Sequence, residues 1–254
     1  MIKKQFKSFL AALMFFTRIP VSFKTGNNTA SFEKATKFLP VIGWIVGGFC
    51  ALIVWSCSLI FPVLVSVILS MIAGILLTGA FHEDGLSDVC DGFGGGRTKE
   101  RILEIMKDSH TGAYGVIGLI MILGLKFVSL NEISIKLLPF AMIAAHSLSR
   151  FATVMMMNIY PYVRRSTESK VKSVITKMSF AEILFAGICG VLPLLLFQNY
   201  YFFLLIIPVI FAALLLGIYF NKRIGGYTGD CLGATQQITE VVFYLSLIVL
   251  WKYI

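Results

Sequence analysis

The sequence predicts an all-α protein, a polytopic bundle of membrane-spanning helices with an amphipathic helix at its N-terminus. Of its 254 residues, 57% are hydrophobic and only 14% are charged, whereas about 25% of the residues in a soluble domain are charged. Apolar runs recur at close to the ~20 residues that a helix needs to cross a bilayer. The basic residues are concentrated between alternate pairs of these runs, a pattern typical of membrane proteins.

The first twenty residues, MIKKQFKSFLAALMFFTRIP, combine a basic start with a short apolar core. They lack the small-residue cleavage site of a secretory signal, and Arg18 and Pro20 end the apolar run. We therefore expect a helix that lies in the membrane interface.

Seven candidate spans follow, and the last is short enough that six crossings remain an alternative. No internal repeat, low-complexity tract or linker separates a soluble domain, so residues 1–254 are expected to form one integral membrane domain. The candidate spans are 38–62, 63–82, 113–130, 137–158, 179–197, 200–220 and 237–251.

The basic residues predict the orientation of the bundle. Eighteen of the 22 lysines and arginines lie before the first span or in the loops after the second, fourth and sixth spans. Lys136 and Lys252 lie on the other side, and Lys126 and Arg150 lie within spans. The positive-inside rule makes the basic side cytoplasmic, which places the N-terminus inside and, with seven spans, the C-terminus outside.

Composition also narrows the binding partners. The net charge of +9 suits anionic lipids or phosphate-bearing substrates. Nucleic acid is not expected, because the basic residues flank spans and form no separate basic domain. The five cysteines include no C-x-x-C pair, so neither a disulfide framework nor a zinc site is predicted.

An acidic cluster follows the second span, in the stretch FHEDGLSDVCDGFGGG. Asp84, Asp88 and Asp91 are spaced by four and three residues, which puts them on one helix face. Like charges on one face repel unless a cation lies among them, and oxygen ligands favour a hard ion such as Mg²⁺. His82 and Glu83 lie beside this face. The alternative is a solvated acidic end of a helix that leaves the membrane.

Two features after the cluster suggest phosphate binding. Backbone N–H groups of the glycine run, including Gly94 and Gly95, could approach phosphate oxygens, with Arg97 adding charge; a plain flexible turn is the alternative. A helical stretch over 98–115 then carries Lys107 and Asp108 where the chain returns to the membrane. We take Asp108 as a candidate site residue and treat Glu100 as solvated.

A second glycine- and aspartate-bearing stretch, IGGYTGDCLGATQQITE (224–240), is predicted to emerge on the same membrane face. The two distinctive segments are therefore expected to meet at the cytoplasmic mouth of the bundle. Asp230 in this stretch could alternatively be the N-cap of the final helix.

Several of these stretches resemble the signatures of the cobalamin synthase (adenosylcobinamide-GDP ribazoletransferase) family. The resemblance implies a Mg²⁺-dependent integral membrane enzyme that joins adenosylcobinamide-GDP to α-ribazole or its 5′-phosphate and releases GMP. It also allows for partners among other membrane-associated enzymes of the cobalamin pathway. The matching stretches are HEDGLSDVCDGFGGG, RILEIMKDSHTGAYG, GGYTGDCLGATQQITE, FFTRIPV, FLPVIGWIVGG and Ser149-Arg150.

The resemblance also implies roles for individual residues. His82 would orient a ligand or accept the attacking proton, and Asp230 would supply the acidic group of the second segment. Arg150, which could instead be a snorkelling arginine, and Arg164 would contact phosphate or carboxamide groups. The implied metal ligands are Glu83, Asp84, Asp88 and Asp91, and the implied substrate contacts are Gly94, Gly95, Arg97, Lys107, Arg150, Arg164, Thr228 and Gly229.

Two other functions are alternatives, a membrane CDP-alcohol phosphotransferase and a transporter. Asp88, Asp91 and Gly92 loosely match the membrane CDP-alcohol phosphotransferases, but no Ala-Arg pair follows at the required distance. A transporter should carry ionisable groups at mid-span. Here Lys126 and Arg150 are the lysine and arginine residues predicted within spans, while most of the acidic residues gather at one mouth.

Overall fold

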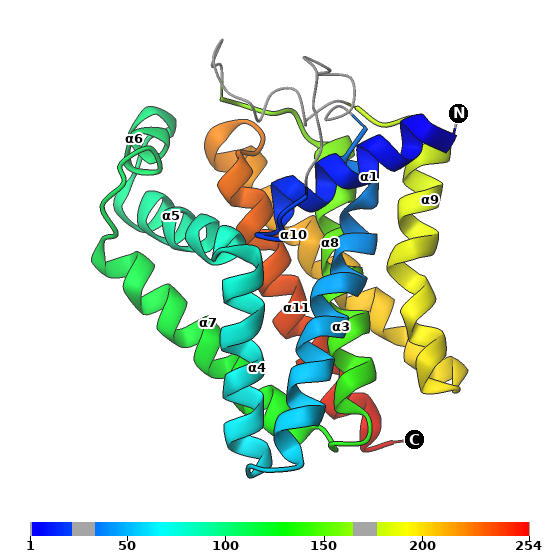
Figure 1. Ribbon diagram of the computed structural model, residues 1–254. Helices are drawn as coiled ribbons and strands as arrows, with labels where there is room; N and C mark the ends of the chain where they lie inside the picture. Colours follow the sequence, from blue (N-terminus) through cyan, green and yellow to red (C-terminus); the bar gives the residue numbers. More distant parts are fainter. Residues whose placement is uncertain (1, 22–33, 165–176, 254) are drawn as a thin grey trace.

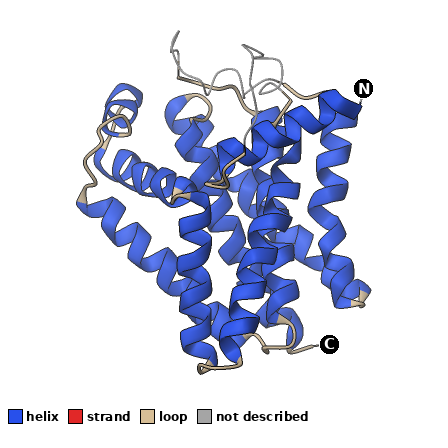
Figure 2. Ribbon diagram, viewed as in Figure 1, coloured by secondary structure: helices blue, strands red, loops and turns tan. Residues whose placement is uncertain are grey.

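The protein is described by a computed structural model, which places residues 2–21, 34–164 and 177–253. Within these ranges the ordered elements are helical, and Figure 2 shows helices joined by loops. The α-helices are α1 (Ile2–Phe16), α3 (Leu39–Ser58), α4 (Val63–Thr78), α5 (Phe81–Gly95), α6 (Lys99–Ile105), α7 (Ala113–Glu132), α8 (Leu138–Ile159), α9 (Phe180–Val191), α10 (Ile206–Ile224) and α11 (Gly229–Trp251). Three 3₁₀ helices, η1 (Thr36–Phe38), η2 (Leu192–Phe197) and η3 (Tyr200–Leu205), join or extend them.

The polytopic helical bundle predicted from the sequence is confirmed. In the described part of the chain, six helical segments are long and apolar enough to cross a membrane, and a seventh is added if the bent pair α4–α5 counts as one span. The described N- and C-terminal ends lie at opposite ends of the bundle (Figure 1). Lys24, Arg165, Lys170 and Lys172, which contribute to the predicted charge asymmetry, lie outside the described residues.

Several predicted span boundaries differ from the helices by four residues or more. The first span ends at Ser58 and not at residue 62, and the sixth ends at Ile224 and not at residue 220. The second span ends at Thr78 and not at residue 82. The last helix begins at Gly229, eight residues before the predicted start of that span. Its first turns carry polar residues such as Gln236 and Gln237, which read as a loop in the sequence but are buried among neighbouring helices.

A sharp break separates α4 from α5. Gly79 and Ala80 both adopt left-handed backbone conformations, with φ of 68° and 58°. Glycine commonly ends a helix in this way, whereas alanine does so at an energetic cost. The two helices meet at 89°, so α5 runs across the end of the bundle while α4 follows its axis (Figure 1).

α8 and α11 lie at the centre of the bundle. In their membrane-spanning stretches, 78% and 67% of the residues are buried. α7, α9 and α10 lie at the outside of the bundle, where only 22–33% of the residues in each spanning stretch are buried. Their leucine, isoleucine and phenylalanine side chains are exposed. α1 lies across the same end of the bundle as α5 (Figure 1). It exposes Lys3 and Lys4 and buries Ala12 and Phe16, as expected for an interfacial helix.

Candidate active site

The two aspartate-bearing segments meet, as the sequence predicts, where α5 crosses the start of α11. The crossing is close because both helices present glycines. A Cβ atom added at Gly85 would lie 3.0 Å from the Cα and carbonyl oxygen of Asp230, and one added at Gly233 would lie 3.0 Å from the carbonyl oxygen of His82. Small residues allow helices to approach in this way. The approach brings Asp84 and Asp230 to one pocket.

Arg164 connects the segment that contains Asp230 to the end of α6. Its guanidinium lies 2.8 Å from the Asp230 carboxylate and donates a hydrogen bond of 2.8 Å to the carbonyl oxygen of Met106 at the end of α6. The N-cap of α11 is Thr228, whose hydroxyl accepts from the backbone N–H of Cys231 at 3.3 Å. The alternative role of Asp230 as the N-cap is therefore wrong, and its carboxylate is available to Arg164 and to ligands.

A pocket of about 140 Å³ opens between these elements. Its lining includes the charged residues Asp84, Asp230 and Arg164 together with several apolar and aromatic side chains. Gly229, a predicted substrate contact, also lines it, and the space where its Cβ would be is open. Thr228 is buried beside the pocket as the cap of α11.

Asp88, one turn after Asp84 on α5, lies in an electrostatic field that favours a cation. Burial together with the charges of Asp230 and Asp84 raises the pKa of Asp88 to about 7, and Arg164 offsets only part of this effect. The described residues contain no group of three or more acidic, histidine or cysteine side chains arranged to hold a metal by themselves. Mg²⁺, however, is usually held by one or two carboxylates together with waters and substrate phosphates. The residues around the pocket fit that mode of binding.

His82 lines both the pocket and a cavity inside the bundle. Its side chain is buried, and neither ring nitrogen has a hydrogen-bond partner among the described residues. Because buried polar atoms are nearly always satisfied, this imidazole is placed to bind a ligand or an ordered water.

The predicted metal cluster is divided by the structure, because Glu83 and Asp91 point elsewhere. Glu83 turns into the bundle, where one carboxylate oxygen accepts a hydrogen bond of 2.9 Å from Gln237. Asp91 caps α7, since its two oxygens accept from the backbone N–H groups of Gly112 and Gly115 at 2.7 and 2.9 Å. As placed, these two carboxylates bind protein groups and do not join Asp84 at the pocket.

The glycine run does not form the predicted phosphate-binding loop. Gly94 and Gly95 belong to α5, so their N–H groups are directed along a helix. A Cβ atom at Gly94 would lie 2.7 Å from the ring of Tyr114, which shows that the glycine makes room for the start of α7. Arg97 is exposed just beyond the helix, and its contact with substrate stays a prediction.

Lys107 and Asp108 lie on an exposed turn between α6 and α7. The Asp108 carboxylate pairs with the ring of His110 at 2.6 Å, and this hydrogen bond lowers its pKa. Neither residue lines the pocket, so their roles also stay predictions.

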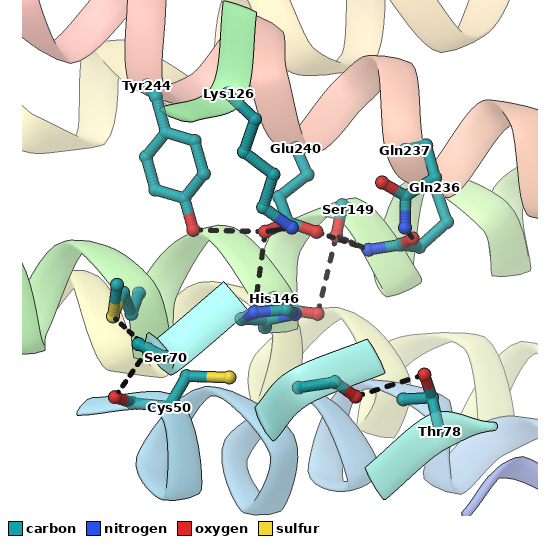
Figure 3. Close-up of polar contacts among 12 residues, drawn as sticks. Cys50, Ser70, Thr78, Lys126, His146, Ser149, Gln236, Gln237, Glu240 and Tyr244 are labelled. Atoms are coloured by element: carbon teal, nitrogen blue, oxygen red, sulfur yellow. Dashed lines mark hydrogen bonds and ion pairs between the residues drawn. The ribbon is translucent and has the colours of Figure 1, made fainter. Parts of the chain in front are cut away.

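Sequence reasoning missed a buried polar network inside the bundle (Figure 3). Glu240 lies at its centre, 2.7 Å from the ammonium of Lys126, and it accepts hydrogen bonds from Gln236 and Tyr244 at 2.7 and 3.0 Å. The ring of His146 lies 3.4 Å from the same carboxylate. The signal available in the sequence was Lys126 itself, because a lysine within a span calls for an acidic partner.

Arg150 borders this network and not the pocket. Its side chain is 1% exposed, and it donates a hydrogen bond of 2.9 Å to the carbonyl oxygen of His146. The snorkelling alternative is therefore wrong, and a direct contact with substrate has no support from its position. The network surrounds a cavity of about 20 Å³, room for one or two waters.

The family model described as cobalamin-5-phosphate synthase matches residues 8–248. Adenosylcobinamide-GDP ribazoletransferases from Shewanella amazonensis and Ralstonia pickettii are 43% and 44% identical over 98% and 97% of both chains. The enzyme of Leptospira interrogans is 41% identical over 99% of this chain and 98% of its own. No solved structure matches. The chain therefore belongs to the cobalamin-5-phosphate synthase family and is an enzyme of the adenosylcobinamide-GDP ribazoletransferase kind.

Proposed function

We propose that the protein joins adenosylcobinamide-GDP to α-ribazole, or to its 5′-phosphate, in a Mg²⁺-dependent reaction that releases GMP. The names of its relatives supply the substrates. The observation that carries the chemistry is the pocket in which Asp84 and Asp230 face Arg164, with Asp88 beside them. Such a group of carboxylates and one guanidinium suits a metal-bound diphosphate.

In this reaction a hydroxyl of the ribazole sugar forms a bond to the phosphorus that carries the cobinamide arm. The bond from that phosphorus to the GMP oxygen breaks, and GMP leaves with the electron pair. Asp84, Asp88 and Asp230 would hold Mg²⁺, which when bound supplies charge neutralisation for the departing phosphate. Arg164 would orient the phosphates, and the unpartnered His82 would accept the proton of the attacking hydroxyl. Positioning and charge neutralisation do most of the work in phosphoryl transfers.

The deciding experiment measures GMP release from adenosylcobinamide-GDP by the purified protein. Release should require both α-ribazole and Mg²⁺. Asp88→Asn should abolish it, whereas Glu100→Gln, which alters an exposed acidic residue on α6, should turn over normally. GMP release that does not depend on α-ribazole, or a fully active Asp88→Asn protein at limiting Mg²⁺, would contradict the proposal.

We further propose that the site faces the cytoplasm from the bacterial or archaeal cytoplasmic membrane. The support is the charge asymmetry of the sequence together with the position of α5 and α6 at the end of the bundle where the N-terminus lies (Figure 1). Single cysteines introduced into a cysteine-free background can test this. In right-side-out vesicles an impermeant thiol reagent should label Ile60→Cys, at the opposite end, and spare Arg97→Cys. The reverse pattern would invert the topology.

A further inference from the structure

Part of the pocket lining is a cluster of three aromatic rings, Phe15, Phe16 and Phe81, here called the aromatic wall. The first two come from the last turn of α1 and the third from the first turn of α5. Their rings pack edge to face, with centroids 4.8 Å apart for Phe15 and Phe16, 5.6 Å for Phe15 and Phe81, and 5.9 Å for Phe16 and Phe81. α1 thus contributes to the pocket although it lies across the end of the bundle.

The aromatic wall is not fully covered by other side chains of the protein. The Phe81 side chain is 41% exposed and borders the pocket. Next to it lies His82, which is 3% exposed and whose ring nitrogens both lack a partner. An apolar surface of aromatic rings beside one buried, unpartnered imidazole is suited to a flat ring system with few polar atoms.

We propose that this wall binds the planar base of the acceptor nucleoside, the benzimidazole ring of α-ribazole. The proposal rests on the function proposed above and assigns one substrate to this part of the pocket lining. With the base against the wall, its ribose would extend toward Asp84 and Asp230 in the same pocket, where the bond to phosphorus forms.

The chemistry of the wall favours this base over the guanine of the other substrate. Guanine presents several donors and acceptors along its edge, and burying them against phenylalanine rings would leave them unpaired at a high cost. A benzimidazole riboside presents a single ring nitrogen as acceptor, so its burial against the phenylalanine rings costs far less.

The test compares Phe16→Leu and Phe81→Leu with Phe9→Leu. Phe9 is a matched control because it also lies on α1 and packs edge to face with another ring, Phe38, at 5.8 Å, but does not line the pocket. The KM for α-ribazole should rise about tenfold in the two pocket variants, the effect of losing one base–aromatic contact. The KM for adenosylcobinamide-GDP should not change, and Phe81→Tyr, which keeps the ring, should retain the low KM.

A second measurement separates this proposal from the function itself. Binding of α-ribazole alone, followed by the fluorescence of its benzimidazole ring, should weaken in the same two variants and needs no turnover. A wild-type protein that turns over while the variants keep their KM for α-ribazole would overturn the aromatic site but not the function. A rise in the KM for adenosylcobinamide-GDP instead would assign the wall to that substrate and equally overturn the proposal. Because Phe16 is 5% exposed, Phe81→Leu decides the matter if Phe16→Leu fails to fold.

Discussion

Adding one methyl group at Gly85 should separate α5 from α11 and impair the enzyme more than its fold. The Cβ of Gly85→Ala would lie 3.0 Å from both the Cα and the carbonyl oxygen of Asp230. These are backbone atoms of a packed helix, so the helices must move apart by a few tenths of an ångström. Overpacking of this kind costs about 1–3 kcal/mol, partly offset by the ~0.5–1 kcal/mol that alanine gains over glycine within a helix.

The displacement of the two helices would move the proposed reacting groups, because Asp84 precedes Gly85 and the added Cβ would contact Asp230. Small misplacements of reacting groups can lower the rate by about 10²-fold. We therefore expect Gly85→Ala to show a modest change in melting temperature and a loss of turnover of about that order. Gly48→Ala is the control, since Gly48 lies inside α3 with no atom within 4 Å of its added Cβ.

The measurements are α-ribazole-dependent GMP release and thermal unfolding in the same detergent. Gly48→Ala should keep full turnover and should be as stable as the wild type or slightly more so. If Gly85→Ala matched Gly48→Ala in both turnover and stability, the close contact between α5 and Asp230 would not be a requirement of the site.

Three further predictions concern charged side chains. Asp230→Asn should fold normally and lose most of its turnover, since it does not cap α11; a normal rate would remove it from the site. Asp91→Asn should lower the melting temperature, because the helix-capping carboxylate that binds the N–H groups of Gly112 and Gly115 loses its charge; an unchanged melting temperature would contradict the capping role. Lys126→Met alone should destabilise the protein by about 3–5 kcal/mol because it leaves the charge of Glu240 buried and unpaired. Combining it with Glu240→Gln should recover much of that loss in a double-mutant cycle, and strict additivity of the two changes would argue against the pair.

The sequence predicted the helical bundle well because a helix needs about 20 mostly apolar residues to cross a bilayer, so apolar runs of that length mark the spans. It also predicted that the segments of Asp84 and Asp230 meet, because counting basic residues returned both to one membrane face. The start of α11 was predicted too late for a related reason. Gln236 and Gln237 are polar but buried, and their amide NH₂ groups donate to Ser149 on α8 and Glu83 on α5, partners that the sequence does not place nearby.

For the acidic cluster, helical periodicity predicted the shared helix face but not the contacts of each carboxylate. Asp84, Asp88 and Asp91 do share a face of α5, but at 1.5 Å per residue Asp91 lies about 10 Å further along the axis than Asp84. At that distance the neighbour of α5 is no longer α11 but the start of α7, whose free N–H groups bind the carboxylate. Periodicity gives the direction of a side chain, whereas its partner depends on which helix crosses at that level.

The buried network and the pocket are connected through one helix. Asp230 and Glu240 both belong to α11, ten residues and therefore about 15 Å apart along its axis. Glu240 ties the helix to Lys126 on α7 and His146 on α8, and an unpaired charge at this depth would be costly. Rotation or sliding of α11 would break these contacts, so the network fixes the register in which Asp230 is presented to α5. A buried ion pair contributes little to net stability compared with an apolar core. Its role in this bundle is better explained by the position that it imposes on the helix bearing the site.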